Sequence, residues 1–240
     1  MGVLPLWLIA GLGNPGESYQ RTRHNLGFWT VEELAARAGA QWDRWAGGGW
    51  MLAACGEIGA QPVVLLKPLR WMNVSGGAVR SALCHWSLSP DRLVVACDDV
   101  ALPDGRIRVR IGGSSGGHKG LASIIEAVGS DAFVRVRVGV GSERDPDQDL
   151  SDFVLRPLTA VQHEWYAAVC HVAADAIALA VTRGGFVRTT LRVQRMPGAD
   201  AAHAQAEDTD GVGRGTHPAA EDPVARLRHG VGGGPSTGRS

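Results

Sequence analysis

The sequence lacks the cysteine patterns that cross-link small secreted domains or hold structural zinc. Its four cysteines, Cys55, Cys84, Cys97 and Cys170, are widely scattered, and no two of them form a C-x-x-C pair. Zinc sites and disulfide frameworks both depend on closely paired or densely repeated cysteines. We therefore expect four reduced thiols and no metal.

The apolar start of the chain lacks both the charge and the length of an export or membrane segment. The first Lys or Arg is Arg21, so the basic region of a secretory signal is missing. A run of about ten apolar residues is also too short to span a bilayer, which takes about 20. These absences favour a cytoplasmic protein.

An excess of either charge is missing as well. The chain has 24 basic and 24 acidic residues, of which 4 and 6 lie in residues 196–240. A surface that binds nucleic acid must then be a local basic patch rather than a property of the whole chain.

Large apolar side chains are scarce in the last part of the chain. Residues 196–240 consist mostly of Gly, Ala, Pro and charged residues, and such a segment buries too little surface to offset its chain entropy. We expect a disordered, low-complexity tail there. Residues 1–195 then form one folded domain, a length suited to a single core.

The rest of the chain alternates between strand and helix patterns. Continuous apolar runs predict buried strands, alternation predicts half-exposed strands, and 3.6-residue periodicity predicts helices. Strands are expected at 6–10, 63–66, 93–96, 106–111 and 133–140, and helices at 28–38, 75–85, 121–128 and 158–182. This order predicts an α/β fold, a three-layer sandwich in which helices flank a mixed, twisted sheet.

The first strand is followed by Gly11-Leu-Gly-Asn-Pro-Gly16, which spells the G-x-G-x-x-G of a dinucleotide-binding loop. That loop needs free N–H groups at the start of a helix to bind a pyrophosphate. Here Pro15 removes one N–H, and Glu17 places a carboxylate where the phosphate would lie. The acid that binds the ribose is also missing, so we expect no cofactor.

A second glycine-rich segment, Gly113-Ser-Ser-Gly-Gly117, matches the G-x-S-x-G turn of serine hydrolases. That turn follows a buried central strand, whereas the strand predicted before it carries three arginines. A serine esterase that uses Ser115 is therefore kept only as a second alternative.

Four segments in order resemble the bacterial-type peptidyl-tRNA hydrolase family. They are Gly11–Gly16 with Thr22–Asn25, then Lys67–Gly76, Asp98–Gly105 and Gly112–Leu121. Phe133–Gly141 and Phe153–Leu155 extend the match, so that it covers about residues 6–193. The resemblance implies an esterase that hydrolyses the bond between a peptide and the 3′-terminal ribose of tRNA, without metal or cofactor.

The family's catalytic histidine corresponds to His24, and the aspartate that orients it corresponds to Asp98. A neutral imidazole is a suitable general base near pH 7, and a carboxylate fixes its tautomer. Taken alone, His24 could equally be a loop histidine. The resemblance assigns it the activation of a water molecule.

Substrate contacts are implied at Asn14, Tyr19, Met72 and Asn73. An amide donates and accepts hydrogen bonds without titrating, which suits a group that holds a carbonyl, a water or a ribose. Structural roles are also open, because Asn14 suits a turn, Asn73 could cap a helix and Met72 could belong to the core.

Arginines alternate along two predicted strands and could form a cationic stripe. By resemblance, Arg110 and Arg137 bind the 5′-phosphate of the tRNA acceptor end, which gives register without reading sequence. For Arg106 and Arg108, a solvated sheet face is the preferred interpretation.

The sequence departs from the family pattern at Lys119, where the family usually has an asparagine. A lysine cannot accept a hydrogen bond, although its charge could hold a phosphate or an oxyanion, and we include it among the substrate-binding residues. The main alternative is therefore a catalytically inactive, RNA-binding relative of the same fold. In either case we expect a monomer whose partner is the acceptor end of peptidyl-tRNA.

Overall fold

The computed structural model describes residues 6–45, 50–141 and 147–193. Within them, eight strands form one mixed sheet in the order β2-β3-β4-β1-β5-β7-β6-β8. The central strands β4, β1, β5 and β7 run parallel, and the outer strands pair antiparallel to their neighbours. The strands are β1 (Trp7–Gly11), β2 (Asp43–Arg44), β3 (Met51–Ile58), β4 (Gln61–Pro68), β5 (Leu93–Asp99), β6 (Arg106–Ile111), β7 (Val134–Gly139) and β8 (Thr189–Arg192).

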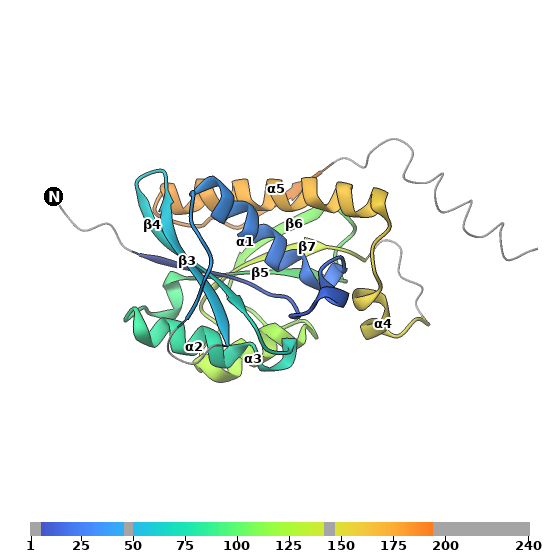
Figure 1. Ribbon diagram of the computed structural model, residues 1–240, viewed down its shortest axis with the longest axis horizontal. Coiled ribbons are helices and arrows are strands. Elements are labelled where there is room, and N and C mark those ends of the chain that lie inside the picture. The colour runs from blue at the N-terminus through green and yellow to red at the C-terminus, as the bar shows by residue number, and fades with distance from the viewer. Residues whose placement is uncertain (1–5, 46–49, 142–146, 194–240) are drawn as a thin grey trace, which may run out of the picture. The chain divides into compact units, whose positions relative to one another are not determined.

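Helices cover both faces of this sheet (Figure 1). They are α1 (Leu26–Arg37), α2 (Gly76–His85), α3 (Lys119–Val128), α4 (Leu150–Leu155) and α5 (Ala160–Thr182), with 3-10 turns η1 (Glu17–Tyr19), η2 (Arg23–Asn25), η3 (Met72–Val74) and η4 (Pro90–Arg92). Helices α1 and α5 lie on one face, and α2 and α3 lie on the other. The three-layer α/β sandwich predicted from the sequence is confirmed.

The two cores reflect the alternation of side chains along each strand. Ile9 and Val94 face α1 and α5, whereas Leu8 and Val95 face α2 and α3. Every residue of β1 and β5 is buried, as expected of parallel strands covered on both sides. Packing on both faces therefore holds β1 and β5, and with them their carboxyl ends, in place between the two helix layers.

Helix α1 crosses the end of β1 at unusually close range. A Cβ added at Gly27 would collide with the Ala96 carbonyl oxygen and with the Leu12 backbone, and one at Gly11 would collide with the Gly27 carbonyl. Only glycine lets the two backbones approach this closely. This contact sets the start of α1, and η2 immediately before it, directly against the carboxyl ends of β1 and β5.

The predicted elements are all present, with ends shifted by a few residues. Three strands and one helix lie outside the predicted set, namely β2, β3, β8 and α4. The prediction that β7 is half-exposed was wrong, because five of its six residues are buried, including Arg135. The glycine-rich segment after β6 covers this part of the sheet and accepts hydrogen bonds from the Arg135 guanidinium.

Among the residues that the structure describes, α5 is the one helix long and apolar enough to cross a membrane by length and composition alone. It packs along α1 and contributes Tyr166, Val169 and Ala173 to the core, which is the behaviour of a core helix. The four cysteines are free thiols, as expected. The predicted tail, residues 196–240, lies outside the described residues.

Candidate active site

The candidate site lies where β1 and β5 end. His24 lies on η2, immediately before α1, and Asp98 lies near the carboxyl end of β5. Ligands in open α/β sheets usually bind at these ends of the strands, because the loops that follow them converge there. Two residues separated by 74 positions in the chain are brought into direct contact by this arrangement.

His24 and Asp98 form a short, largely buried pair. The Nδ1 atom of His24 lies 2.9 Å from Oδ1 of Asp98, and the two side chains are 12% and 3% exposed. Burial opposes the imidazolium, but the charge of Asp98 and its hydrogen bond outweigh burial and raise the pKa of His24. The same contacts, with a hydrogen bond from His118, hold the pKa of Asp98 well below its usual range against the effect of burial.

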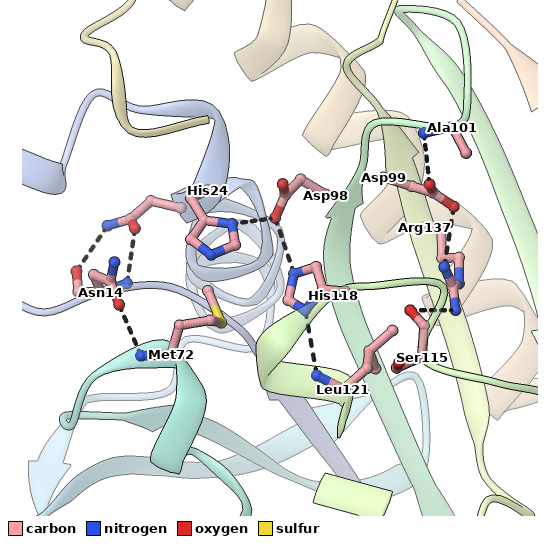
Figure 2. A network of polar contacts seen from close by, with 11 residues as sticks. Asn14, His24, Met72, Asp98, Asp99, Ala101, Ser115, His118, Leu121 and Arg137 are labelled. Atoms are coloured by element: carbon pink, nitrogen blue, oxygen red, sulfur yellow. Dashed lines mark hydrogen bonds and ion pairs between the residues drawn. The ribbon is translucent and has the colours of Figure 1, made fainter. Parts of the chain in front are cut away.

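A second histidine shares the same carboxylate oxygen. Nε2 of His118 lies 3.1 Å from Oδ1 of Asp98, and the His24 and His118 ring centroids are 5.1 Å apart. His118 is also the N-cap of α3, because its Nδ1 accepts the N–H of Leu121 at 3.2 Å. One carboxylate thus holds two imidazole rings from distant parts of the chain (Figure 2).

These contacts determine which ring atoms carry protons. Because Nδ1 of His118 accepts from Leu121, the proton of the neutral ring lies on Nε2 and is donated to Asp98. Ionised Asp98 accepts from Nδ1 of His24 in the same way. Nε2 of His24 is left with a free lone pair, and in Figure 2 it faces away from Asp98, towards Met72. This is the atom suited to take a proton.

His24, Asp98 and His118 also place three possible metal-ligand atoms within 4.8 Å of one another. A metal-binding nitrogen must present a lone pair, and the atom on its other side normally donates a hydrogen bond. In His118 the arrangement is reversed, since Nδ1 accepts and Nε2 carries the proton. The donor set therefore fits proton transfer better than metal binding.

Asn14 is held on the other side of His24 by three hydrogen bonds. Its side-chain oxygen accepts the N–H of Met72 at 2.9 Å, and Asn25 both accepts the Asn14 N–H and donates to its carbonyl oxygen. The orientation of the Asn14 amide is fixed by the Met72 contact, because only the oxygen can accept. Its NH₂ group remains available as a donor beside the histidine.

A cavity of about 300 Å³ opens over the pair. Its lining includes His24, Asp98, His118 and Lys119. Helix α4 adds Leu150, Ser151 and Val154 to the lining. Mixed polar and apolar walls next to a buried pair with shifted pKa values are typical of an active site.

Comparison with known proteins agrees with this geometry. The family model described as peptidyl-tRNA hydrolase matches residues 8–201. A peptidyl-tRNA hydrolase of Carboxydothermus hydrogenoformans is 44% identical over 179 residues, which cover 75% of this chain and 94% of the relative. One from Mycobacterium bovis is 42% identical over 178 residues and covers 74% and 92%. The chain belongs to the peptidyl-tRNA hydrolase family.

The fold of this family member agrees with solved structures as well. The crystal structure of peptidyl-tRNA hydrolase from Acinetobacter baumannii superposes with a TM-score of 0.65 at 32% identity, covering 74% of this chain and 87% of that one. The family resemblance and the enzyme class expected from the sequence are confirmed.

Within this peptidyl-tRNA hydrolase family member, the predicted site residues fall into three groups. His24, Asp98 and Lys119 line the cavity, whereas Asn14 and Met72 lie beside His24 and are not part of the cavity lining. Asn73 is exposed on η3, next to Met72. Tyr19 is half-buried on η1, and its ring meets the edge of Trp71 at 5.7 Å between centroids.

The arginines form less of a stripe than their spacing predicts. Arg135 is buried and donates to the carbonyl oxygens of Gly113, Ser114 and Asp131, so it is not part of an exposed basic surface. Arg137 is 12% exposed and binds Asp99 at 3.1 Å and the Ser114 carbonyl at 2.9 Å. On β6, Arg106 and Arg110 are exposed, whereas Arg108, expected with Arg106 on a solvated face, is half-buried.

The glycine loop after β1 is occupied by the protein itself. Leu12 donates its N–H to Ala96 at 2.9 Å, and the N–H of Asn14 is bound by Asn25 at 2.8 Å. Neither group is free to bind a pyrophosphate.

Sequence reasoning missed three residues that build this site. His118 lay in a matched segment, but no periodicity distinguishes it from the neighbouring loop residues. Asn25 and Asp99 also lay within matched segments, but the sequence assigned neither of them a role. For Asn25 and His118, a useful signal would have been their position beside a helix start, where side chains often bind backbone groups.

Proposed function

We propose that this protein hydrolyses the ester bond between the peptide and the 3′-terminal ribose of peptidyl-tRNA, with His24 as the general base. The observation that carries the proposal is the His24–Asp98 contact, which leaves Nε2 of His24 free and facing the side of Asn14 and Met72. Membership of the peptidyl-tRNA hydrolase family supports the choice of substrate.

The reaction needs two proton transfers, and one imidazole performs both. His24 Nε2 takes a proton from water as the water oxygen bonds to the ester carbonyl carbon, which gives a tetrahedral oxyanion. The oxyanion then collapses, the bond to the ribose oxygen breaks, and the imidazolium returns its proton to that oxygen. The products are tRNA with a free hydroxyl and a peptide carboxylic acid, which loses its remaining proton to solvent and becomes the carboxylate. Ionised Asp98 stabilises the imidazolium between the two steps.

Donors for the oxyanion come from the Asn14 side of the site. The NH₂ group of Asn14 is fixed in orientation by Met72, and such preorganised donors stabilise developing charge strongly. Asn73 and Lys119 complete the substrate contacts, Lys119 as a cation at the cavity wall. Tyr19 and Met72 provide apolar contact beside them.

We assign the tRNA acceptor end to the side of Arg110 and Arg137. Arg110 is exposed, and Arg137 lies beside the glycine-rich loop, on the opposite side of the His24–Asp98 pair from Asn14 (Figure 2). Because Arg137 is already bound to Asp99, a phosphate there would share its guanidinium with that carboxylate. Arg110 then supplies the larger part of the salt-dependent affinity.

The two alternatives are less well supported by the geometry. A relative that only binds RNA does not need Asp98 to hold both His118 and His24 and so fix which nitrogen of His24 is free to accept a proton. For a serine esterase, Ser115 would need a histidine partner, yet both ring nitrogens of His118 are bound to Asp98 and Leu121. We also propose that residues 1–195 act as one catalytic domain, as a monomer in the cytoplasm.

The test is direct turnover of N-acetyl-aminoacyl-tRNA by the purified protein, followed as release of free tRNA. His24→Asn should lower kcat by about 10²- to 10⁴-fold without changing the melting temperature by more than a few degrees. Ser115→Ala should retain activity and resist serine-directed phosphonates as the parent does. Undiminished turnover by His24→Asn would refute the assigned base, and inactivation of the parent by phosphonate would favour Ser115.

A further inference from the structure

Arg135 is a buried arginine that the reaction described so far does not use. It lies near the start of β7 and is only 1% exposed, although arginine is rarely buried completely unless its charge is paired. Among the described residues, every hydrogen-bond acceptor of its guanidinium is a backbone carbonyl oxygen, and none is a carboxylate. The partners of this cation therefore come from the course of the chain around it.

These acceptors belong to the glycine-rich segment after β6 and to the turn before β7. Nη1 donates to the carbonyl oxygens of Gly113 and Ser114, the latter at 3.3 Å, and Nη2 donates to the Asp131 carbonyl at 3.1 Å. The guanidinium carbon also lies 4.5 Å from the centre of the Phe133 ring. A buried charge that loses its acceptors is costly, so the segment cannot turn its carbonyls away from Arg135 freely.

Gly113 is held at both ends of its backbone. Its N–H donates to Oδ2 of Asp131 at 2.8 Å, while its carbonyl accepts from Arg135. The φ angle of Gly113 is +109°, a conformation that favours glycine, and a Cβ there would lie 3.2 Å from Nη1 of Arg135. The glycine-rich segment therefore leaves the sheet in one fixed direction.

The same series of carbonyl contacts leads to His118. Arg137 donates to the carbonyl oxygens of Ser114 at 2.9 Å and Ser115 at 3.3 Å, next to those that Arg135 binds. The Ser115 carbonyl also accepts the N–H of His118 at 3.2 Å, and the His118 ring donates to Asp98. The segment that Arg135 holds is thus the one that places His118 beside the catalytic carboxylate.

We propose that Arg135 is a positioning residue of the active site, which fixes the glycine-rich segment so that His118 reaches Asp98. The inference rests on the proposed function, because it concerns how the assigned base is oriented. Arg135 is too deeply buried to contact tRNA, so its effect is on the chemical step rather than on substrate binding.

The first experiment replaces Arg135 by an apolar side chain of similar length. Arg135→Met cannot donate to the segment, and apolar replacements of buried charged groups often keep a protein folded. We expect kcat for N-acetyl-aminoacyl-tRNA to fall by about three- to ten-fold, with KM changed by less than about two-fold. Arg135→Lys keeps a cation and should retain more of kcat. Arg106→Met, which removes an exposed arginine of β6, is the control and should leave both constants unchanged.

A second measurement separates positioning from a merely structural role. If Arg135 acts through His118, the double variant Arg135→Met/His118→Ser should have the kcat of His118→Ser alone, within about two-fold. Losses of kcat that multiply in the double variant would overturn the proposal. Melting temperatures confirm that each variant is folded at the assay temperature.

Further results would also overturn the proposal. Unchanged kcat in Arg135→Met would show that the segment keeps its place without the cation, and a raised KM with a weaker salt dependence would assign Arg135 to RNA binding. If Arg135→Met does not fold, Gly113→Ala disturbs the same contact from the segment and should show the same loss and the same coupling to His118→Ser. Failure of the proposed function is distinguishable, because the parent protein would then release no tRNA.

Discussion

One oxygen atom, Oδ1 of Asp98, holds the two imidazole rings of the site. Because His118 is fixed by Leu121 as the tautomer that donates from Nε2, the carboxylate is oriented from one side before it orients His24 from the other. The geometry of the base thus depends on a chain of three side chains and one backbone N–H. Substitutions along this chain should change kcat more than KM, because they alter proton transfer rather than substrate contact.

His118 has two roles that a single substitution can separate. Serine is a good N-cap, so His118→Ser should keep α3 intact, but its side chain is too short to reach Asp98. We expect kcat to fall about ten-fold, in the range seen for partners of a catalytic group, with little change in KM or melting temperature. Steady-state kinetics and thermal denaturation provide the check. A large loss of stability with normal kcat would reverse the assignment.

The pH dependence of the reaction should reflect His24. The general base acts when neutral, and Asp98 raises the pKa of His24 above its ordinary value of 6.5 against the effect of burial. Activity should therefore fall as the pH is lowered, with a midpoint of kcat/KM above 6.5. A midpoint at or below 6.5 would contradict the assigned pair.

Lys119 provides a matched test of the same group. Its positive charge lowers the pKa of His24, so Lys119→Asn should move the acid midpoint of kcat/KM to higher pH, whereas Lys119→Arg should leave it in place. The profile should be measured at low and high salt, because a charge at the cavity wall is partly screened. A downward shift in Lys119→Asn would exclude the electrostatic role.

For single residues, the sequence predicted which residues belong to the site better than it predicted which groups they contact. His24, Asp98 and Asn14 lie together as the resemblance implies, although nothing in spacing joins positions 24 and 98. The arrangement of His118 could not be predicted, because it depends on where α3 begins in space. Arg135 was placed on a solvent face by its alternation with Val134 and Val136, since the pattern does not reveal the loop that covers it.

The elements that carry the site are held by a backbone contact between glycines. Gly27 on α1 lies against Ala96 of β5 and the Leu12 backbone, so α1, which directly follows His24, has no room for an added atom against the strand that bears Asp98. Interiors at this density resist added atoms.

Gly27→Ala should destabilise the protein and displace the site together. We expect a loss of about 1–3 kcal/mol, the usual cost of overpacking, and a fall in kcat, since η2 directly precedes the shifted helix. Gly77→Ala in α2 is the control: a Cβ there meets nothing within 4 Å, and alanine favours a helix by up to about 1 kcal/mol. Denaturant unfolding and turnover distinguish the two. Equal stability of both variants would exclude the close-packing argument.

The element patterns were strongest where burial is uniform. The strands β1 and β5 were predicted from continuous apolar runs, which arise because both faces of these strands are covered. By contrast, β3 reads Met-Leu-Ala-Ala-Cys-Gly-Glu-Ile and lacks clear alternation, and β8 is a four-residue strand at the sheet edge. Such segments become strands by pairing with a neighbour, which a local pattern does not record.

For the molecule as a whole, zero net charge makes tRNA binding depend on a few positions. Arg110→Ala should raise KM more than it lowers kcat, and it should reduce the slope of log affinity against log salt by about 1. Arg183→Ala is the matched control, because Arg183 follows α5 and this end of the helix contacts the β3–β4 turn at Gly59, away from the carboxyl ends of the strands. An unchanged slope in Arg110→Ala would remove it from the RNA interface.

Arg137→Ala should behave differently from Arg110→Ala. Its guanidinium binds both Asp99 and the carbonyl oxygens of Ser114 and Ser115, so its loss should lower stability and kcat as well as affinity. Comparing melting temperature, kcat and salt slope for the two variants separates a phosphate contact from a loop support. If Arg137→Ala changed only the salt slope and left the melting temperature and kcat unchanged, the supporting role of its internal contacts would be wrong.

The hydrogen bond from Leu121 to His118 gives the enzyme an internal reporter. Any event that protonates or turns that imidazole must release the amide of Leu121, whose nitrogen and proton resonances are visible by NMR in solution. The Leu121 amide peak in a ¹⁵N-labelled sample would thus show whether His118 keeps its position beside Asp98. Ligands could be screened by this peak without a radioactive or aminoacylated substrate.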